Sequence, residues 1–440
     1  VIIIFIFIII NLFIYYMKVS TLVVGLNPAL QRRLVLPGSL TPGDVHRITA
    51  VQTGIGGKGQ DVAVALSCLA SNGGGGGNGG GDNDNDDSNT NQQQLQQLPR
   101  LLQFLGQGAS GDTLMGQLDP HVDRVSSLTI RTASPLRVCT SLVAPDSTTE
   151  LVEPSGRIAS AEMQELWHRL EQESSSSSSP SWDGCAFMGS LPPDCPSDIY
   201  AQLYDKLTPG LCVVDSLVGL PALLETIHQK QQQKQQSSSS SSSSSSKDST
   251  SHGSVVLKIN VDELCALVGL SKEEEEQKQQ GDVDDTDVTV FQAVSMFLDQ
   301  FDKAATSLTA VALTNGPDPA YVASFPDQTL YKVPVPQLQT TTTTLYPIGA
   351  GDAVAAGTLA AWQTLEQDAS WVLPDTLRQL LLLSKQQEGP SVPSLVTAVS
   401  FGLACGTASC LQEENSVLDV CDVASLFGRV GAPTRVHDDS

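Results

Sequence analysis

The segment 347–357, PIGAGDAVAAG, combines small residues with a single carboxylate. Gly349, Ala350 and Gly351 allow a ligand to approach the backbone closely, and the alanine-rich run after Asp352 favours a helix. Free amide groups at the start of such a helix bind anions. A carboxylate in the same turn could accept a proton from a hydroxyl group while the amides stabilise a transferring phosphoryl group. The alternative is that Asp352 only caps the helix.

A second glycine-rich turn lies near the other end of the chain. In the segment 54–63, GIGGKGQDVA, the residues Gly56 and Gly57 precede Lys58, directly ahead of an apolar helix. The spacing is not that of a GxxxxGK[ST] phosphate loop. It predicts a close-approach turn whose lysine meets a phosphate or a polar sugar, and the alternative is a tight strand-to-helix turn with a solvated lysine. If both turns act on one substrate, they must converge on one cleft.

The elements that must position these turns are short strands and amphipathic helices. The apolar runs do not alternate with polar residues, which favours strands covered on both faces, as in a parallel sheet. We therefore expect an α/β fold with a doubly wound, mainly parallel sheet flanked by helices. The expected strands are 18–26, 211–215, 255–259 and 308–314, and the expected helices are 61–69, 161–170, 197–207, 290–299 and 353–365.

Two less apolar segments predict a small antiparallel sheet, a lid that closes over a ligand. Its approximate bounds are 31–53 and 128–152. Arg32, Arg33 and Arg47 within it are expected to be solvated charges.

The overall charge limits the partners. Asp and Glu number 48 against 24 Lys and Arg, which gives a formal net charge of −24. Such a field repels polyanions, so we expect neither nucleic acid binding nor stable membrane association. Nine cysteines without a CxxC pair indicate reduced thiols and a cytoplasmic location, with organellar import left open by the uncertain N-terminus. Six histidines without ligand spacing do not support zinc.

Several segments do not have a composition that folds. Residues 1–16 are apolar but shorter than the roughly 20 residues that span a bilayer, so we interpret them as an artefact of an upstream start or as a leader. Four polar tracts are expected to be disordered insertions. The remainder predicts one α/β domain over 17–430 and a tail over 431–440. The four insertions are 73–97, 173–181, 229–251 and 272–287.

Eight short segments, taken in order, resemble the ribokinase-like PfkB carbohydrate kinases. Within that family the resemblance is to the hexose-phosphate branch of 1-phosphofructokinase and tagatose-6-phosphate kinase, and it extends from residue 17 to about 430. The segments are NPALQR (27–32), GGKGQDVA (56–63), LRVCTSL (136–142), TTELVEP (148–154), FMGSLPPD (187–194), KINVDEL (258–264), ALTNGP (312–317) and PIGAGDAVAAG (347–357).

The resemblance implies ATP-dependent transfer to a hydroxyl of a sugar phosphate, with a ketohexose phosphate as acceptor and Mg²⁺ as cofactor. Asp352 matches the catalytic base, and the amides of Gly349, Ala350 and Gly351 match the anion hole. Asn260 and Glu263 match a pair that organises Mg²⁺ through water, although both could simply cap a helix. The resemblance also implies a homodimer formed through the lid. The nucleotide-side matches are Lys258, Thr314, Asn315 and Gly316, and the acceptor-side matches are Asn27, Gln31, Gly56, Gly57, Lys58, Asp61, Arg137 and Ser190.

The sequence departs from the family pattern at three acceptor-side positions. Gln31 stands where the family has Asp, Asp61 where it has Asn, and Cys139 where it has Asn. We hypothesise that one carboxylate has moved to another wall of the sugar pocket, and a non-phosphorylated acceptor stays open because a carboxylate repels a phosphate. Two other functions remain: a kinase of a free sugar or nucleoside, and a catalytically impaired pseudokinase that binds sugar phosphates.

Overall fold

The computed structural model describes residues 20–71, 98–176, 182–239, 253–270, 285–338, 345–367, 369 and 372–436. The apolar segment 1–16 and the predicted insertion 73–97 lie outside the described residues.

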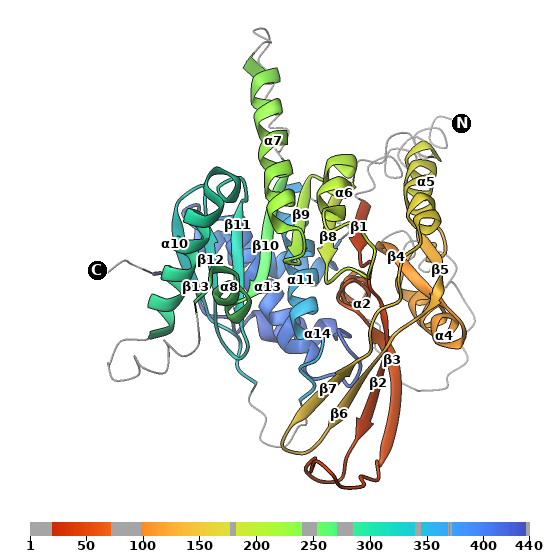
Figure 1. Ribbon diagram of the computed structural model, residues 1–440. Coiled ribbons are helices and arrows are strands. Elements are labelled where there is room, and N and C mark those ends of the chain that lie inside the picture. Colours follow the sequence, from red (N-terminus) through yellow and green to blue (C-terminus); the bar gives the residue numbers. More distant parts are fainter. Residues whose placement is uncertain are drawn as a thin grey trace, which may run out of the picture.

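A ten-stranded sheet forms the centre of the molecule, in the order β14-β13-β12-β11-β10-β9-β8-β1-β4-β5 (Figure 1). Neighbouring strands from β11 to β5 are parallel, whereas β12, β13 and β14 extend the sheet antiparallel. The predicted, mainly parallel sheet is confirmed. The strands are β1 (Ser20–Val24), β4 (Arg100–Gln107), β5 (Thr129–Pro135), β8 (Trp182–Met188), β9 (Leu211–Asp215), β10 (Ser254–Asn260), β11 (Ala310–Asn315), β12 (Asp318–Ser324), β13 (Thr329–Val333) and β14 (Thr434–Val436).

Helices cover both faces of this sheet, because its central strands are apolar on both sides. One face packs against α2 (Lys58–Ala70), α4 (Ala109–Leu118), α11 (Ala350–Gln367), α12 (Asp375–Glu388), α13 (Ser394–Ser409) and α14 (Val420–Phe427). The other face packs against α5 (Ser160–Ser176), α6 (Ile199–Leu207), α7 (Leu220–Ser239), α8 (Val261–Val268) and α10 (Asp285–Ala305). Within the described part of the chain, none of these helices has the length and apolarity to cross a membrane.

The lid is a four-stranded sheet that projects from the body of the molecule (Figure 1). It contains β2 (Ala29–Val35), β3 (Ala50–Gly56), β6 (Val138–Val143) and β7 (Thr148–Val152), in the order β3-β2-β6-β7. The expectation of a purely antiparallel lid was wrong, because the central pair β2 and β6 is parallel. These two strands continue from β1 and β5, which run in the same direction in the main sheet.

Some predicted boundaries need correction. The second predicted lid segment does not begin at 128, since β5 belongs to the main sheet. The predicted insertions are partly helical: α5 continues to Ser176, α7 continues to Ser239 and α10 begins at Asp285. Glutamine and lysine are good helix formers, so the tract that begins at 229 extends α7. The predicted tail contains β14, which pairs with β13 at the edge of the sheet.

Helix α2 approaches β1 so closely that only glycine fits at the crossing. A Cβ atom on Gly59 would overlap the Cα of Gly25. We expect Gly59→Ala to lower the free energy of unfolding by about 1–3 kcal/mol, because the helix must move away from the sheet. Urea unfolding measures this, and the matched control is Gly54→Ala in β3, where an added Cβ meets nothing within 4 Å. Equal losses in the two variants would contradict the packing argument.

Candidate active site

A cleft of about 440 Å³ lies at the carboxyl ends of the parallel strands, under the lid. Gly57 and Lys58 from one predicted turn and Gly349 and Asp352 from the other line the same cleft. The two turns therefore converge, as the sequence analysis required. Other predicted residues in its walls are Asn27, Gln31, Asp61, Arg137, Ser190 and Glu263, and residues that the prediction missed are Glu150, Asp215 and Asn415.

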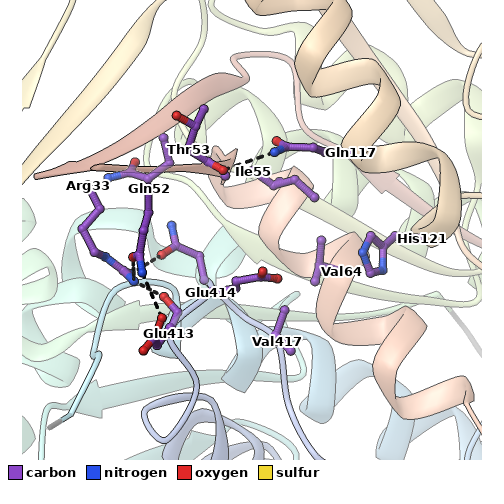
Figure 2. A pocket seen from close by; sticks show the side chains of 13 residues that line it. Arg33, Gln52, Thr53, Ile55, Val64, Gln117, His121, Glu413, Glu414 and Val417 are labelled. Atoms are coloured by element: carbon purple, nitrogen blue, oxygen red, sulfur yellow. Dashed lines mark hydrogen bonds between the residues drawn. The ribbon is translucent and has the colours of Figure 1, made fainter. Parts of the chain in front are cut away.

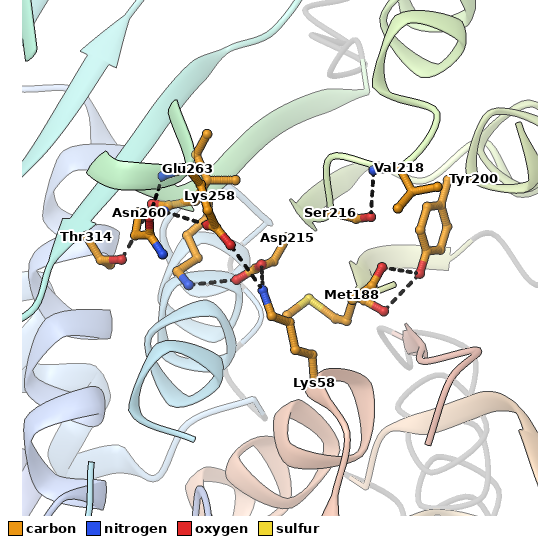
Figure 3. Close-up of polar contacts among 12 residues, drawn as sticks. Lys58, Met188, Tyr200, Asp215, Ser216, Val218, Lys258, Asn260, Glu263 and Thr314 are labelled. Atoms are coloured by element: carbon orange, nitrogen blue, oxygen red, sulfur yellow. Dashed lines mark hydrogen bonds and ion pairs between the residues drawn. The ribbon is translucent and has the colours of Figure 1, made fainter. Parts of the chain in front are cut away.

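Asp215 is the centre of the charged groups in this cleft (Figure 3). It ends β9 and is only 2% exposed. Its two carboxylate oxygens accept hydrogen bonds from the Nζ atoms of Lys58 at 2.5 Å and Lys258 at 2.7 Å. Burial alone would raise the pKa of Asp215, but the two lysines hold that pKa below its usual value. The sequence signal was available, because an Asp at the end of a buried parallel strand lies at the ligand-binding edge of such a sheet.

The same network raises the pKa of Lys58 and holds Lys258 beside the turn that begins α11. Burial alone would lower the pKa of Lys58, but the Asp215 carboxylate outweighs it and raises that pKa. Lys258, predicted on the nucleotide side, is buried and also faces the turn before α11: a Cβ atom on Gly351 would lie 3.2 Å from its Nζ. Lys58 is therefore held ionised in the cleft, and Lys258 lies next to the predicted phosphate turn.

Asp352 is the third residue of α11 and not its N-cap, so the capping alternative was wrong. Burial, supported by the neighbouring charge of Asp215 and opposed by Lys258 and Lys58, raises the pKa of Asp352 to about 7. A carboxylate with this pKa can take up a proton near neutral pH.

The turn before α11 has a distinctive backbone. Gly349 has a φ of 85°, which favours glycine, and its carbonyl accepts a hydrogen bond from Ser416 Oγ at 2.9 Å. The amide of Ala350, which we expected to be free, donates to the carbonyl of Pro347 at 3.1 Å. Ala350 thus contributes to the shape of the turn in this state.

The predicted magnesium pair forms a complete capping box for α8. Asn260 Oδ1 accepts from the Glu263 amide at 2.6 Å, and Glu263 Oε2 accepts from the Asn260 amide at 2.9 Å (Figure 3). The second carboxylate oxygen of Glu263 lies 3.9 Å from Lys58 Nζ, beside the cleft. An exposed oxygen donor in this place fits a hydrated Mg²⁺ held through water. Within the described residues, no group of three or more His, Cys, Asp or Glu could bind a metal directly.

The three residues at the end of β11 lie outside the cleft lining. Thr314 is aligned with Asn260 in the parallel pair β10 and β11, and its hydroxyl donates weakly to the carbonyl of Ile259 at 3.5 Å. Asn315 and Gly316 follow it, at the carboxyl edge of the sheet.

On the acceptor side, several polar groups already have partners. Arg137 donates to the carbonyls of Asn27 at 2.8 Å and Pro28 at 3.3 Å, and Asn27 Nδ2 donates to Ser190 Oγ at 3.0 Å. Arg137 therefore holds the turn at the end of β1. Gln31 is buried and donates to Ser141 Oγ at 2.5 Å.

Arg33 is not the solvated charge that we expected, although Arg32 and Arg47 are exposed. It shares the inner face of β2 with Gln31 and is only 5% exposed. Its guanidinium donates to the carbonyl of Glu413 and to Asn415 Oδ1, and it lies over the ring of Tyr346. Figure 2 shows Arg33 and Glu413 at a second cavity of about 380 Å³, beside the cleft.

The sequence matches no protein-family model and none of the curated proteins compared with it. The fold, however, matches solved structures over nearly the whole chain. Phosphofructokinase-2 from Escherichia coli in complex with fructose 6-phosphate has a TM-score of 0.57 at 19% identity, with 93% of this chain and 98% of that chain covered. A possible 1-phosphofructokinase from Thermotoga maritima gives 0.56 at 16%, with 95% and 100% covered. Ribokinase from Thermotoga maritima gives 0.54 at 13%, with 93% and 99% covered.

The chain therefore has the same fold as these phosphofructokinase and ribokinase structures. At these identities the matches establish the fold and leave the substrate open.

The ion pairs of Asp215 with Lys58 and Lys258 lead to a prediction about stability. In Asp215→Asn two ammonium groups lose their shared anion, so we expect the free energy of unfolding to fall by about 3–5 kcal/mol, the range for breaking a buried pair. Chemical denaturation measures the loss. The control is Asp194→Asn, which breaks the exposed pair between Arg157 and Asp194 and should change stability little. Similar losses in both variants would mean that the buried network does not hold the cleft together.

Proposed function

We propose that this chain is a carbohydrate kinase that transfers the γ-phosphoryl group of ATP to a hydroxyl group of a sugar acceptor. The observation that carries the proposal is the convergence of the Asp352 turn and the Lys58 turn on one cleft beneath a lid. The ribokinase-like fold supports it, because the same architecture occurs in solved sugar kinases.

In the proposed mechanism, Asp352 accepts the proton of the attacking hydroxyl as the new P–O bond forms and the bond to ADP breaks. Lys258 and the turn at Gly349 lie on the same side of the cleft and stabilise negative charge on the transferring group. Glu263 would hold a hydrated Mg²⁺, which supplies further charge neutralisation at the nucleotide phosphates. The lid covers the cleft and would exclude water, which otherwise competes as acceptor.

The resemblance to the hexose-phosphate branch favours a ketohexose phosphate. A second candidate, a non-phosphorylated acceptor, is favoured by one observation: the buried Asp61 carboxyl lines the cleft. Lys58, the predicted phosphate ligand, is already bonded to Asp215.

A homodimer through the lid remains a proposal. The lid exposes apolar side chains at Val45 (83%), Val51 (51%) and Leu151 (54%), which a second copy of the lid would bury. We expect analytical ultracentrifugation to show a dimer that Val51→Lys weakens by at least tenfold, because an introduced charge is costly in an apolar interface. A monomeric wild type would contradict the proposal.

The catalytic role of Asp352 is testable through turnover and pH. We expect Asp352→Asn to bind ATP but to lose about two or more orders of magnitude in kcat, since a positioned proton acceptor is removed. In the wild type, kcat/KM should rise with pH and level off above about 7, because Asp352 must be ionised to act as base. Coupled ADP assays measure both, and near-normal turnover in Asp352→Asn would remove Asp352 from this role.

The pH dependence of the free energy of unfolding is an independent test of the raised pKa of Asp352. A carboxyl whose pKa is raised on folding binds its proton more tightly in the folded state, so stability falls as pH rises from about 4 to about 7. Asp352→Asn should therefore be more stable than the wild type at pH 8 and should gain little at pH 4. If the wild-type protein binds sugars and ATP but forms no ADP with any acceptor, the pseudokinase interpretation is favoured.

A further inference from the structure

Among the described residues, Asp61 is an acidic residue without a compensating partner. It lies in the first turn of α2, is 4% exposed and lines the cleft. Its Oδ1 atom is buried and makes no hydrogen bond in the described part of the chain. Burial, together with the nearby carboxylates of Asp352 and Glu150, raises the pKa of Asp61 well above its usual value. A buried polar group without a partner is costly, and a ligand that supplies the missing donor relieves the cost.

The charges around Asp61 show which kind of donor would fit. Among the described residues, the cleft lining contains five acidic side chains and two cationic ones. The two cationic side chains are both engaged: Lys58 with Asp215, and Arg137 with the carbonyls of Asn27 and Pro28. The acidic side chains are Asp61, Glu150, Asp215, Glu263 and Asp352.

In the part of the chain that the structure describes, the walls next to Asp61 provide no other cation for it. Gln31 on β2 donates to Ser141, and Ser141 Oγ in turn donates to Glu150 Oε1 at 3.4 Å. Cys139 on β6 is a thiol whose pKa is raised by burial, so it stays uncharged. The end of the cleft near Asp61 and Glu150 is therefore acidic and poor in donors for a carboxylate.

We propose that the acceptor carries a protonated amine that binds to Asp61, and that the substrate class is an amino sugar or amino polyol without a phosphate group. The inference rests on the proposed kinase function and specifies its acceptor. A phosphate at this position would meet carboxylates on two walls, whereas an ammonium group donates charge-assisted hydrogen bonds to them. A neutral sugar would supply donors but would not compensate the charge.

A protonated amine on the acceptor is compatible with phosphoryl transfer to a hydroxyl group of the same molecule. The ammonium nitrogen has no lone pair while it is protonated, so it does not compete as nucleophile. The hydroxyl of the same molecule attacks the γ-phosphorus, its proton passes to Asp352, and ADP leaves with the electrons of the broken bond. Asp61 thus determines which molecule binds and takes no proton from the reacting hydroxyl.

The test compares three classes of matched ligand by isothermal titration calorimetry: amino-deoxyhexoses, their parent hexose and the hexose 6-phosphate. The amino sugars carry the amine at carbon 1, 2, 3 or 6, since the structure does not favour one position. We expect at least one amino sugar to bind the wild type tenfold or more tightly than its parent hexose, and the phosphate to bind worst. The amine preference is the dissociation constant of the parent hexose divided by that of the amino sugar. In Asp61→Asn this ratio should fall to near one, while the parent hexose still binds.

Two controls make the result specific. Asp146→Asn removes an equal charge from an exposed turn of the lid and should leave the preference unchanged. Glu150→Gln should reduce it less than Asp61→Asn does, and it serves as the test variant if Asp61→Asn does not fold. Tightest binding of the hexose phosphate, no amino sugar bound above its parent, or an unchanged preference in Asp61→Asn would each overturn the proposal.

The same ligands separate this inference from the kinase function. ADP release in the presence of ATP reports phosphoryl transfer, whereas calorimetry without ATP reports recognition by Asp61. Amine-selective binding without ADP release would reject the kinase function and keep the recognition. ADP release that is fastest with a sugar phosphate would keep the kinase function and reject the amine.

Discussion

The bonds from Asp215 to two lysines are the interaction on which the rest of the cleft depends. They join β9 to the start of α2 through Lys58 and to β10 through Lys258. Lys58 also lies 3.9 Å from Glu263, and Asp352 lies close enough to sense the charges of both lysines, Asp215 and Glu263. The network therefore fixes the geometry of the cleft and limits how far burial can raise the pKa of the proposed base.

A second constraint connects the lid to the phosphate turn. Arg33 on β2 binds the segment at Glu413 and Asn415, and the next residue, Ser416, donates to the carbonyl of Gly349. Ser416 itself has a φ of 56°, so this short segment is held in an unusual conformation by contacts on both sides. The lid is thus connected to the turn that begins α11 through Arg33, Asn415 and Ser416.

The sequence predicted the parts of the structure that depend on local pattern. The strand 211–215 was predicted with the bounds that the structure shows, because a buried parallel strand is apolar throughout. The turns at Lys58 and Asp352 were recognised because glycine, a charge and a following helix occur together. Pairings distant in sequence were not accessible: the burial of Arg33 depends on Glu413 and Asn415, hundreds of residues away. Similarly, the parallel pairing of β2 with β6 follows from the directions of β1 and β5 and not from either lid strand alone.

Asp61 shows how local and global preferences conflict at a functional position. Helix α2 is otherwise consistent: its residues from Val62 to Leu66 are buried between the sheet and α11, and glycine allows the close approach to β1. An Asp in the first turn also suits the positive end of the helix. However, folding buries this carboxyl beside two others, and no described residue forms a hydrogen bond with its Oδ1 atom, which lowers stability. A helix that needed only stability at this position would be better served by a neutral residue. The unpaired carboxyl is therefore best explained by a ligand that pairs with it, since local violations of this kind concentrate where a protein recognises its substrate.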